Sequence, residues 1–195
     1  MFVDRLQLVA VAHPQGTEVY PNEGLRATPP AFKLYATQHV RAPAAAHDEH
    51  GHDVLARIEK IDRRYPDDFK VGPLRGYAAT HALTLDLGLT TQEAKGRVLL
   101  LLTGWTDYAF SSDNVAAAQR GLAQQWPALQ VKDAKGQWQT VVEDVGIPVG
   151  RPQTLVVDLT GKLPAGRSEV RLVTNLRVYW DRILLDTSGV SRSCS

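Results

Sequence analysis

The sequence has one cysteine, Cys194, and a lone cysteine excludes a disulfide within the chain. It also has little net charge, because 22 Lys and Arg residues stand against 21 Asp and Glu residues and leave a formal charge of +1. Nucleic acids and anionic membranes are captured by strongly basic surfaces. We therefore expect neither nucleic acid nor a membrane among the partners of this chain.

Long hydrophobic runs and export signals are missing as well. The most apolar run, residues 98–102, is far shorter than the roughly 20 residues that a membrane-spanning helix needs. The N-terminus carries Asp4 and shows no basic region followed by an apolar one, so no signal peptide is predicted. The compartment stays open, and we expect an extracellular or periplasmic place if the chain is a piece of an exported protein.

Motifs of known catalytic machinery are also missing from the sequence. It contains no G-x-S-x-G nucleophile elbow, no phosphate-binding loop and no G-x-G-x-x-G pattern. We therefore predict no catalytic residue and no organic cofactor, and an enzyme is the less favoured class.

What remains is the composition of an ordinary globular domain, with 44% hydrophobic and 22% charged residues over 195 positions. A chain of this length buries a substantial core in one domain, which we place at residues 1–187. Residues 188–195 are small, polar and without pattern, and they are predicted to form a disordered tail.

Most periodic segments show the alternation of two that is typical of strands. Residues 98–105 are apolar on both faces, so they are predicted to form the central and most buried strand. Turn-forming residues at 133–136 predict a hairpin between 129–132 and 138–142. The other predicted strands are 6–11, 32–37, 82–88, 153–159, 170–174 and 178–185.

Two segments have helical spacing instead. Residues 54–61 place apolar side chains on one stripe behind Asp53, which is able to cap a helix. A second helix is predicted from Ser112 towards Trp126, with Pro127 as its stop. Many short strands and few helices favour a mainly β fold over a parallel α/β fold. We expect an antiparallel β-sandwich or jelly roll with two inserted helices.

Four motifs resemble a domain of large bacterial multidomain proteins. They are Tyr-Pro-Asp-Asp-Phe at 65–69, Leu-Thr-Gly-Trp at 102–105, Val-Asp-Leu-Thr-Gly-Lys at 157–162 and Thr-Asn-Leu-Arg-Val-Tyr-Trp-Asp at 174–181. That domain occurs beside FG-GAP repeats of the ASPIC/UnbV type or tetratricopeptide repeats. More loosely, the late Tyr-Trp-Asp strand is similar to galactose-binding-like jelly rolls. The resemblance implies neighbouring domains of a parent chain, and it implies no catalytic residues.

The densest group of ligand-type side chains is the segment 47–53. His47, His50 and His52 lie there among carboxylates, a set that suits Zn²⁺ or another divalent metal. Their spacing matches no closed structural zinc site, and Asp53 has the alternative role of helix cap. The sequence leaves two interpretations, a metal site and a solvated loop.

Two stretches combine aromatic rings with polar side chains. Trp105, Asp107 and Tyr108 directly follow the predicted central strand. Aromatic rings stack on the apolar face of a sugar, and nearby polar groups hold its hydroxyls. The alternative is that the rings fill the core and the polar residues cap the following helix.

The second stretch lies on the last predicted strand, where alternation puts Arg177, Tyr179 and Asp181 on one face. Trp180 and Arg182 are then expected on the other face. If both stretches lie side by side, they form one ligand-binding face. Otherwise the charges pair with each other on the exterior.

Together these features predict a non-catalytic accessory module. It binds a glycan or a partner protein, or it docks on a neighbouring domain. A metal-dependent hydrolase that uses residues 47–53 and a purely structural spacer are the alternatives.

Overall fold

A computed structural model describes residues 8–188, and this part of the chain is mainly β. Its strands form three sheets in which neighbouring strands pair antiparallel. One sheet has the order β4 (Ala45–His47), β5 (Tyr77–Asp86), β10 (Glu169–Leu176), β7 (Ala128–Lys132) and β8 (Trp138–Val142). The second has the order β3 (Val40–Arg41), β11 (Val178–Asp186), β6 (Leu99–Thr106) and β9 (Gln153–Asp158). The third pairs β1 (Glu18–Pro21) with β2 (Leu34–Thr37).

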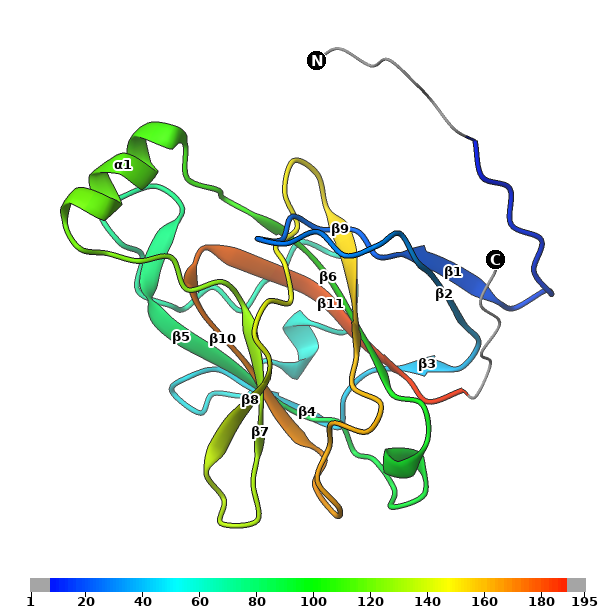
Figure 1. The fold of residues 1–195 in the computed structure, drawn as a ribbon. Coiled ribbons are helices and arrows are strands. Elements are labelled where there is room, and N and C mark those ends of the chain that lie inside the picture. Colours follow the sequence, from blue (N-terminus) through cyan, green and yellow to red (C-terminus); the bar gives the residue numbers. More distant parts are fainter. Residues whose placement is uncertain (1–7, 189–195) are drawn as a thin grey trace.

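The two larger sheets pack against each other in the manner of a β-sandwich (Figure 1). Successive side chains of a strand point to opposite faces, so alternate residues of each sheet meet in one core. Leu83 and Leu85 of β5 lie in the same buried cluster as Leu100 and Leu102 of β6. The prediction of a mainly β, sandwich-like fold with antiparallel sheets is confirmed.

Strand β6 is buried as the sequence predicted. It lies between β11 and β9, and every residue of it except Trp105 is buried. Leu99 and Leu101 point away from the main core and form a second cluster with Val156, against which Tyr20 of β1 packs. The β1–β2 pair thus covers part of the outer face of the sheet, which explains why both faces of β6 are apolar.

The helix predicted at 54–61 is wrong. The segment forms one 3-10 turn, η1 (Leu55–Arg57), and then leaves it. The carbonyl of the fully buried Ile58 accepts a hydrogen bond from the amide of Ile183 in β11, whereas Ile61 is 56% exposed. This bridge to the sheet replaces helical hydrogen bonds, so tertiary contacts override the apolar spacing.

The second predicted helix forms but is shorter. It is α1 (Ser111–Gln119), and Asp113 caps its first turn by accepting a backbone hydrogen bond at 2.9 Å. Gly121 follows with a φ of +68°, a conformation that ends helices. The predicted continuation to Trp126 is therefore wrong. The two expected helices reduce to one α-helix and the short 3-10 turns, of which η2 (Glu93–Lys95) is the second.

Two further segments of the described chain differ from the prediction. No strand forms at residues 8–11, the described part of the segment 6–11, and Leu8 is 95% exposed. Strand β4 (Ala45–His47) was not predicted from the sequence, and its Ala46 is fully buried. Of the predicted tail, only Ser188 lies within the described residues, and its amide donates to the Asp186 carboxylate at 2.9 Å.

A β-bulge in β11 changes the faces predicted for the last strand. The pairing with β6 shifts between Trp180 and Arg182, which makes Asp181 an extra residue. Arg182 therefore shares a face with Tyr179, and the expected placement of Arg182 beside Trp180 is wrong. The bulge also takes Asp181 out of the regular alternation.

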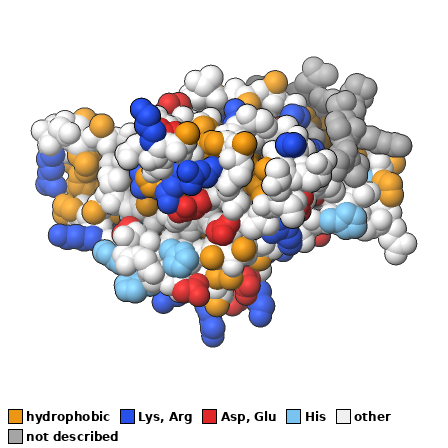
Figure 2. All heavy atoms as spheres, turned by 90° about the horizontal axis from the view of Figure 1, so that it is seen from below, with side chains coloured by type: hydrophobic (Ala, Val, Ile, Leu, Met, Phe, Trp, Pro, Cys, Tyr) orange, Lys and Arg blue, Asp and Glu red, His pale blue; other side chains and the backbone are white. Residues whose placement is uncertain are grey.

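The surface carries charges of both signs. On the face shown in Figure 2, basic and acidic side chains are interspersed, in keeping with the net charge of +1. No helix within residues 8–188 is long and apolar enough to cross a membrane.

Candidate ligand-binding site

The residues predicted to share one ligand-binding face lie in separate groups. Trp105 and Tyr179 are direct neighbours on β6 and β11, and their rings stack with centroids 4.6 Å apart and planes 12° apart. Tyr65 meets both rings edge-on, and Phe69 lies against Tyr179. Burial raises the pKa of the Tyr179 phenol. These rings cover one another and form a packed aromatic cluster.

Arg177 and Asp107 do meet, but their contact belongs to a structural junction. The Arg177 side chain is 15% exposed, and one of its terminal nitrogens donates to the Asp107 carboxylate at 3.1 Å. The other two guanidinium nitrogens donate at 2.9–3.0 Å to the backbone carbonyls of Gly72, Leu74 and Tyr77. All three nitrogens are thus engaged, and two of them hold the 72–77 segment against the strand ends.

Asp181 also serves the backbone. It is 5% exposed, and its Oδ1 accepts hydrogen bonds from the amides of Asp62 and Arg63 at 3.1 and 2.9 Å. Arg63 has a φ of +63°, in the left-handed region that non-glycine residues seldom adopt. The carboxylate thereby fixes the turn that leads to Tyr65 of the aromatic cluster.

The histidine segment is organised around Asp48. Its Oδ1 accepts hydrogen bonds from the amides of His50 and His52 at 2.9 and 2.8 Å, and its Oδ2 lies 2.8 Å from Nδ1 of His52. Burial raises the pKa of Asp48, but these hydrogen bonds outweigh it, so the pKa lies below its ordinary value. His47 is exposed at the end of β4, and Asp53 accepts a backbone hydrogen bond at the start of η1 at 2.9 Å. Within residues 8–188, no group of three or more His, Cys, Asp or Glu side chains is placed to hold a metal ion.

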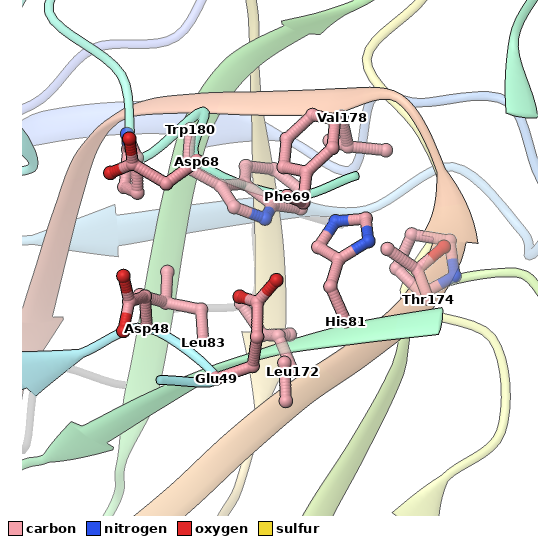
Figure 3. A pocket seen from close by; sticks show the side chains of 13 residues that line it. Asp48, Glu49, Asp68, Phe69, His81, Leu83, Leu172, Thr174, Val178 and Trp180 are labelled. Carbon is pink, nitrogen blue, oxygen red and sulfur yellow. The ribbon is translucent and has the colours of Figure 1, made fainter. Parts of the chain in front are cut away.

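A small pocket lies beside this segment (Figure 3). Phe69 stacks on His81 at a centroid distance of 4.2 Å, and Asp48, Glu49 and Asp68 contribute carboxylates to the lining. Its open space is about 20 Å³. That volume holds little more than one water molecule, so the pocket is too small for an organic ligand.

His81 should make the stability of the fold sensitive to mild acid. Burial lowers the pKa of His81 below its ordinary value of 6.5. The unfolded state then takes up a proton at a higher pH than the folded state. The free energy of unfolding is therefore greatest above about pH 6.5 and declines as the pH falls towards the lower folded pKa.

Chemical denaturation at about pH 7.5 and about pH 5.5 measures this effect. The wild type should lose stability on acidification, and His81→Gln should lose less. The matched control is His39→Gln, which changes an exposed histidine and should behave like the wild type. An equal loss in all three proteins would contradict the assignment to His81.

A larger hollow, which we call the end pocket, opens where β6 and β10 end and β5 begins. Its space is about 170 Å³. Tyr108, one of the predicted ligand residues, lies there and is 40% exposed. Its ring meets Phe110 edge-on at 5.7 Å, and the Arg75 guanidinium lies 5.9 Å from its centroid, farther than Lys33 lies from the Tyr35 ring. The lining consists of Leu25, Gly76, Thr106, Tyr108, Ala109, Asn114, Gln124, Trp126, Ile147, Val149 and Leu176.

One wall of the end pocket depends on a glycine. Gly76 has a φ of +83°, and a Cβ atom at this position would lie 2.3 Å from the backbone nitrogen of Ala109. Only glycine combines this conformation with so close an approach. The connection that follows β6, with Tyr108 on it, therefore packs directly against the start of β5.

Another part of the lining is held by a buried amide. Asn175 is 6% exposed, and its side chain accepts from the Gln125 amide at 2.8 Å and donates to the Ala123 carbonyl at 2.9 Å. These bonds fix the irregular segment after α1. Gln124 and Trp126 consequently become part of the lining.

The polar groups of the end pocket include an amide pair and a hydroxyl. Oδ1 of Asn114 accepts from the Tyr77 hydroxyl and from Nε2 of Gln124, each at 2.9 Å. Thr106 is 5% exposed, yet its hydroxyl has no hydrogen-bond partner among the described residues. Leaving a buried hydroxyl without a partner costs free energy. Thr106 lines the end pocket, and its hydroxyl is a donor and an acceptor that no described protein group uses.

The sequence interpretation found Tyr108 but missed Gln124 and Trp126, because it assigned both to a helix that ends earlier. Gly121 was the available signal, since a glycine after good helix formers marks a helix end. An aromatic residue that follows polar residues beyond such an end is a candidate for a loop-built site.

Neither the comparison with models of protein families nor the comparison with curated proteins finds a match for this chain. The candidate site therefore rests on geometry. The end pocket combines open space, exposed aromatic surface and an unpartnered buried hydroxyl, whereas Trp105, Arg177, Tyr179 and Asp181 are engaged with neighbouring groups of the protein.

Proposed function

We propose that this chain is a non-catalytic module that binds a neutral sugar in the end pocket. The observation that carries the proposal is the buried hydroxyl of Thr106, which has no partner among the described residues and lines a pocket with Tyr108 and Trp126. A sugar hydroxyl both donates and accepts, so it supplies the hydrogen bond that the described protein groups do not make.

The chemistry of the lining favours a sugar over a charged ligand. Aromatic rings bury the apolar face of a pyranose, while amides such as Asn114 and Gln124 bond its hydroxyls. The lining residues given above include no Lys, Arg, Asp or Glu. The space of about 170 Å³ is smaller than the roughly 300 Å³ at which drug-sized sites begin. A single terminal ring therefore fits the proposal better than a long glycan.

The proposal extends to the fold family and the context of the chain. Five- and four-stranded antiparallel sheets that share one core suit a galactose-binding-like jelly roll. The motifs at 65–69 and 174–181 support a place in a larger bacterial multidomain protein, where the module presents a sugar to neighbouring domains or attaches them to a glycan.

A broad glycan array followed by titration calorimetry tests the sugar proposal. Tyr108→Ala should weaken the binding of an array hit by removing the exposed ring. Thr106→Val should weaken it by roughly 2- to 10-fold, the value of one hydrogen bond. Because Thr106→Val removes an unpartnered polar group, its melting temperature should stay equal to or rise above that of the wild type, which a purely structural threonine would not show.

Phe32→Ala is the matched control, since Phe32 is an aromatic residue that is 69% exposed and is not part of the end pocket. It should bind the sugar as the wild type does. The proposal fails if the wild type binds no glycan on the array. It also fails if Tyr108→Ala and Thr106→Val bind as tightly as the wild type.

A further inference from the structure

A second hollow, the valine groove, lies between β8 and β9 beside the segment 22–35. Its space is about 420 Å³. Val142 on one side and Val156 and Val157 on the other give it an aliphatic floor. The groove has one aromatic ring, Tyr35, and the Lys33 ammonium lies over that ring at 4.6 Å from its centroid. The described lining of the valine groove therefore has no free ring face on which a sugar could stack.

The charges around the valine groove are mostly positive. Arg26, Lys33 and Lys162 line it, and none of the three has a carboxylate partner within the described residues. The single acidic residue of the lining, Asp158, uses Oδ1 to accept a hydrogen bond from the Thr160 amide at 3.0 Å. Three cations and one engaged carboxylate make the groove attractive to an anion.

The Arg26 side chain is packed in place but makes no hydrogen bond through its Nε atom within the described part of the chain. Its Nε is buried and has no hydrogen-bond partner among the described residues. Gly146, with a φ of +89°, lies directly against it, because a Cβ atom there would be 3.0 Å from Cγ and 3.2 Å from Nε of Arg26. The packing against Gly146 fixes the Cγ–Nε part of the side chain. The two terminal nitrogens of a guanidinium form a fork of donors that matches a carboxylate.

We propose that the valine groove binds the C-terminal carboxylate of a peptide that ends in an aliphatic residue. Arg26 takes the carboxylate through its terminal guanidinium nitrogens, and Lys33 and Lys162 add attraction from the rim. The last aliphatic side chain of the peptide lies on the valine floor, where it buries apolar surface.

The place of the groove in the fold suits an extended peptide. Strands β8 and β9 are each the last strand of their sheet. Extended peptides bind by adding to such edges, with main-chain hydrogen bonds for affinity and pockets for individual side chains. The site is independent of the end pocket, with which it shares no lining residue.

Fluorescence polarisation with a labelled pentapeptide, Gly-Ser-Gly-Leu-Val, tests this proposal. The peptide with a free C-terminus should bind, and its C-terminal amide should bind at least about tenfold more weakly, because the charge-assisted hydrogen bonds are lost. Added salt should weaken binding of the free carboxylate. Arg26→Gln should reduce affinity by a similar factor, and Lys162→Gln should reduce it less.

The matched control is Arg120→Gln, an exposed arginine just after α1, which should leave peptide binding unchanged. If thermal melting shows that Arg26→Gln is unfolded, Lys162→Gln still tests the contribution of the rim.

Equal binding of the free acid and the amide overturns the proposal, as does equal binding by the wild type and both groove variants. Displacement of the peptide by inorganic phosphate at equal concentration also overturns it, because the groove is then a general anion site. Thr106→Val should bind the peptide normally, which separates this test from that of the sugar site.

Discussion

Leu100→Ala should lower the free energy of unfolding by about 2–5 kcal/mol, the range for removing a large aliphatic side chain from a packed core. Leu100 is fully buried, on the strand that lies between β9 and β11. Its cross-strand partners are Val157 and Leu185, and all three side chains belong to the main core cluster. Truncation therefore loses burial and leaves a cavity that neighbours on both sides cannot easily fill.

Urea denaturation of the wild type and the variant measures this loss. Leu8→Ala is the matched control, because Leu8 is 95% exposed and the same truncation should change stability by less than about 0.5 kcal/mol. A loss below about 1 kcal/mol for Leu100→Ala would mean that β6 is not the centre of the core.

Arg177→Met should lower the free energy of unfolding by about 1–3 kcal/mol, because it breaks a partly buried ion pair and leaves backbone carbonyls without a hydrogen bond. The methionine keeps much of the length and apolar contact of the arginine but none of its donors. The Asp107 carboxylate then loses a partner, and the carbonyls of Gly72 and Leu74 each lose a hydrogen bond. Arg177→Lys should lie in between, because one ammonium group does not reach all these acceptors at once.

Arg75→Met is the control for the Arg177 prediction. Arg75 donates to the same Asp107 carboxylate at 2.9 Å, but its side chain is 45% exposed. An exposed pair of this kind contributes about 0–1 kcal/mol, so the loss should be small. If Arg177→Met keeps its stability and loses sugar binding instead, the role first predicted for Arg177, as a ligand residue, is the correct one.

The predictions that the structure confirms are those that depend on the residue pattern within one strand or hairpin. The alternation at 82–88, the two-faced apolar run at 98–105 and the turn residues at 133–136 all appear in the structure as β5, β6 and the β7–β8 hairpin. Successive side chains of a strand point to opposite faces of the sheet, so the pattern of apolar residues along the strand indicates which faces are buried. The sequence alone was therefore enough for the mainly β class and for the most buried strand.

The predictions that were wrong depend on contacts between distant segments. The apolar spacing at 54–61 gave way to the hydrogen bond between Ile58 and Ile183, which are far apart in the chain. One extra residue in β11 redistributed the faces of Asp181 and Arg182. Neither the long-range hydrogen bond nor the bulge changes the spacing of apolar residues in its own segment. The local sequence pattern therefore does not predict either of them.

The candidate site also depends mostly on contacts between segments that are distant in the sequence. Tyr108 stood out in the sequence, but its neighbours in the end pocket come from connections spread along the chain, including Gly76, Gln124 and Ile147. In the same way Arg26, Lys33 and Lys162 meet around the valine groove only after folding. The sequence determined most of the longer strands and which side chains carry chemistry. The tertiary structure decided which of those side chains are consumed in holding the fold and which are left with free hydrogen-bonding capacity, because partners of a side chain are set by proximity in space.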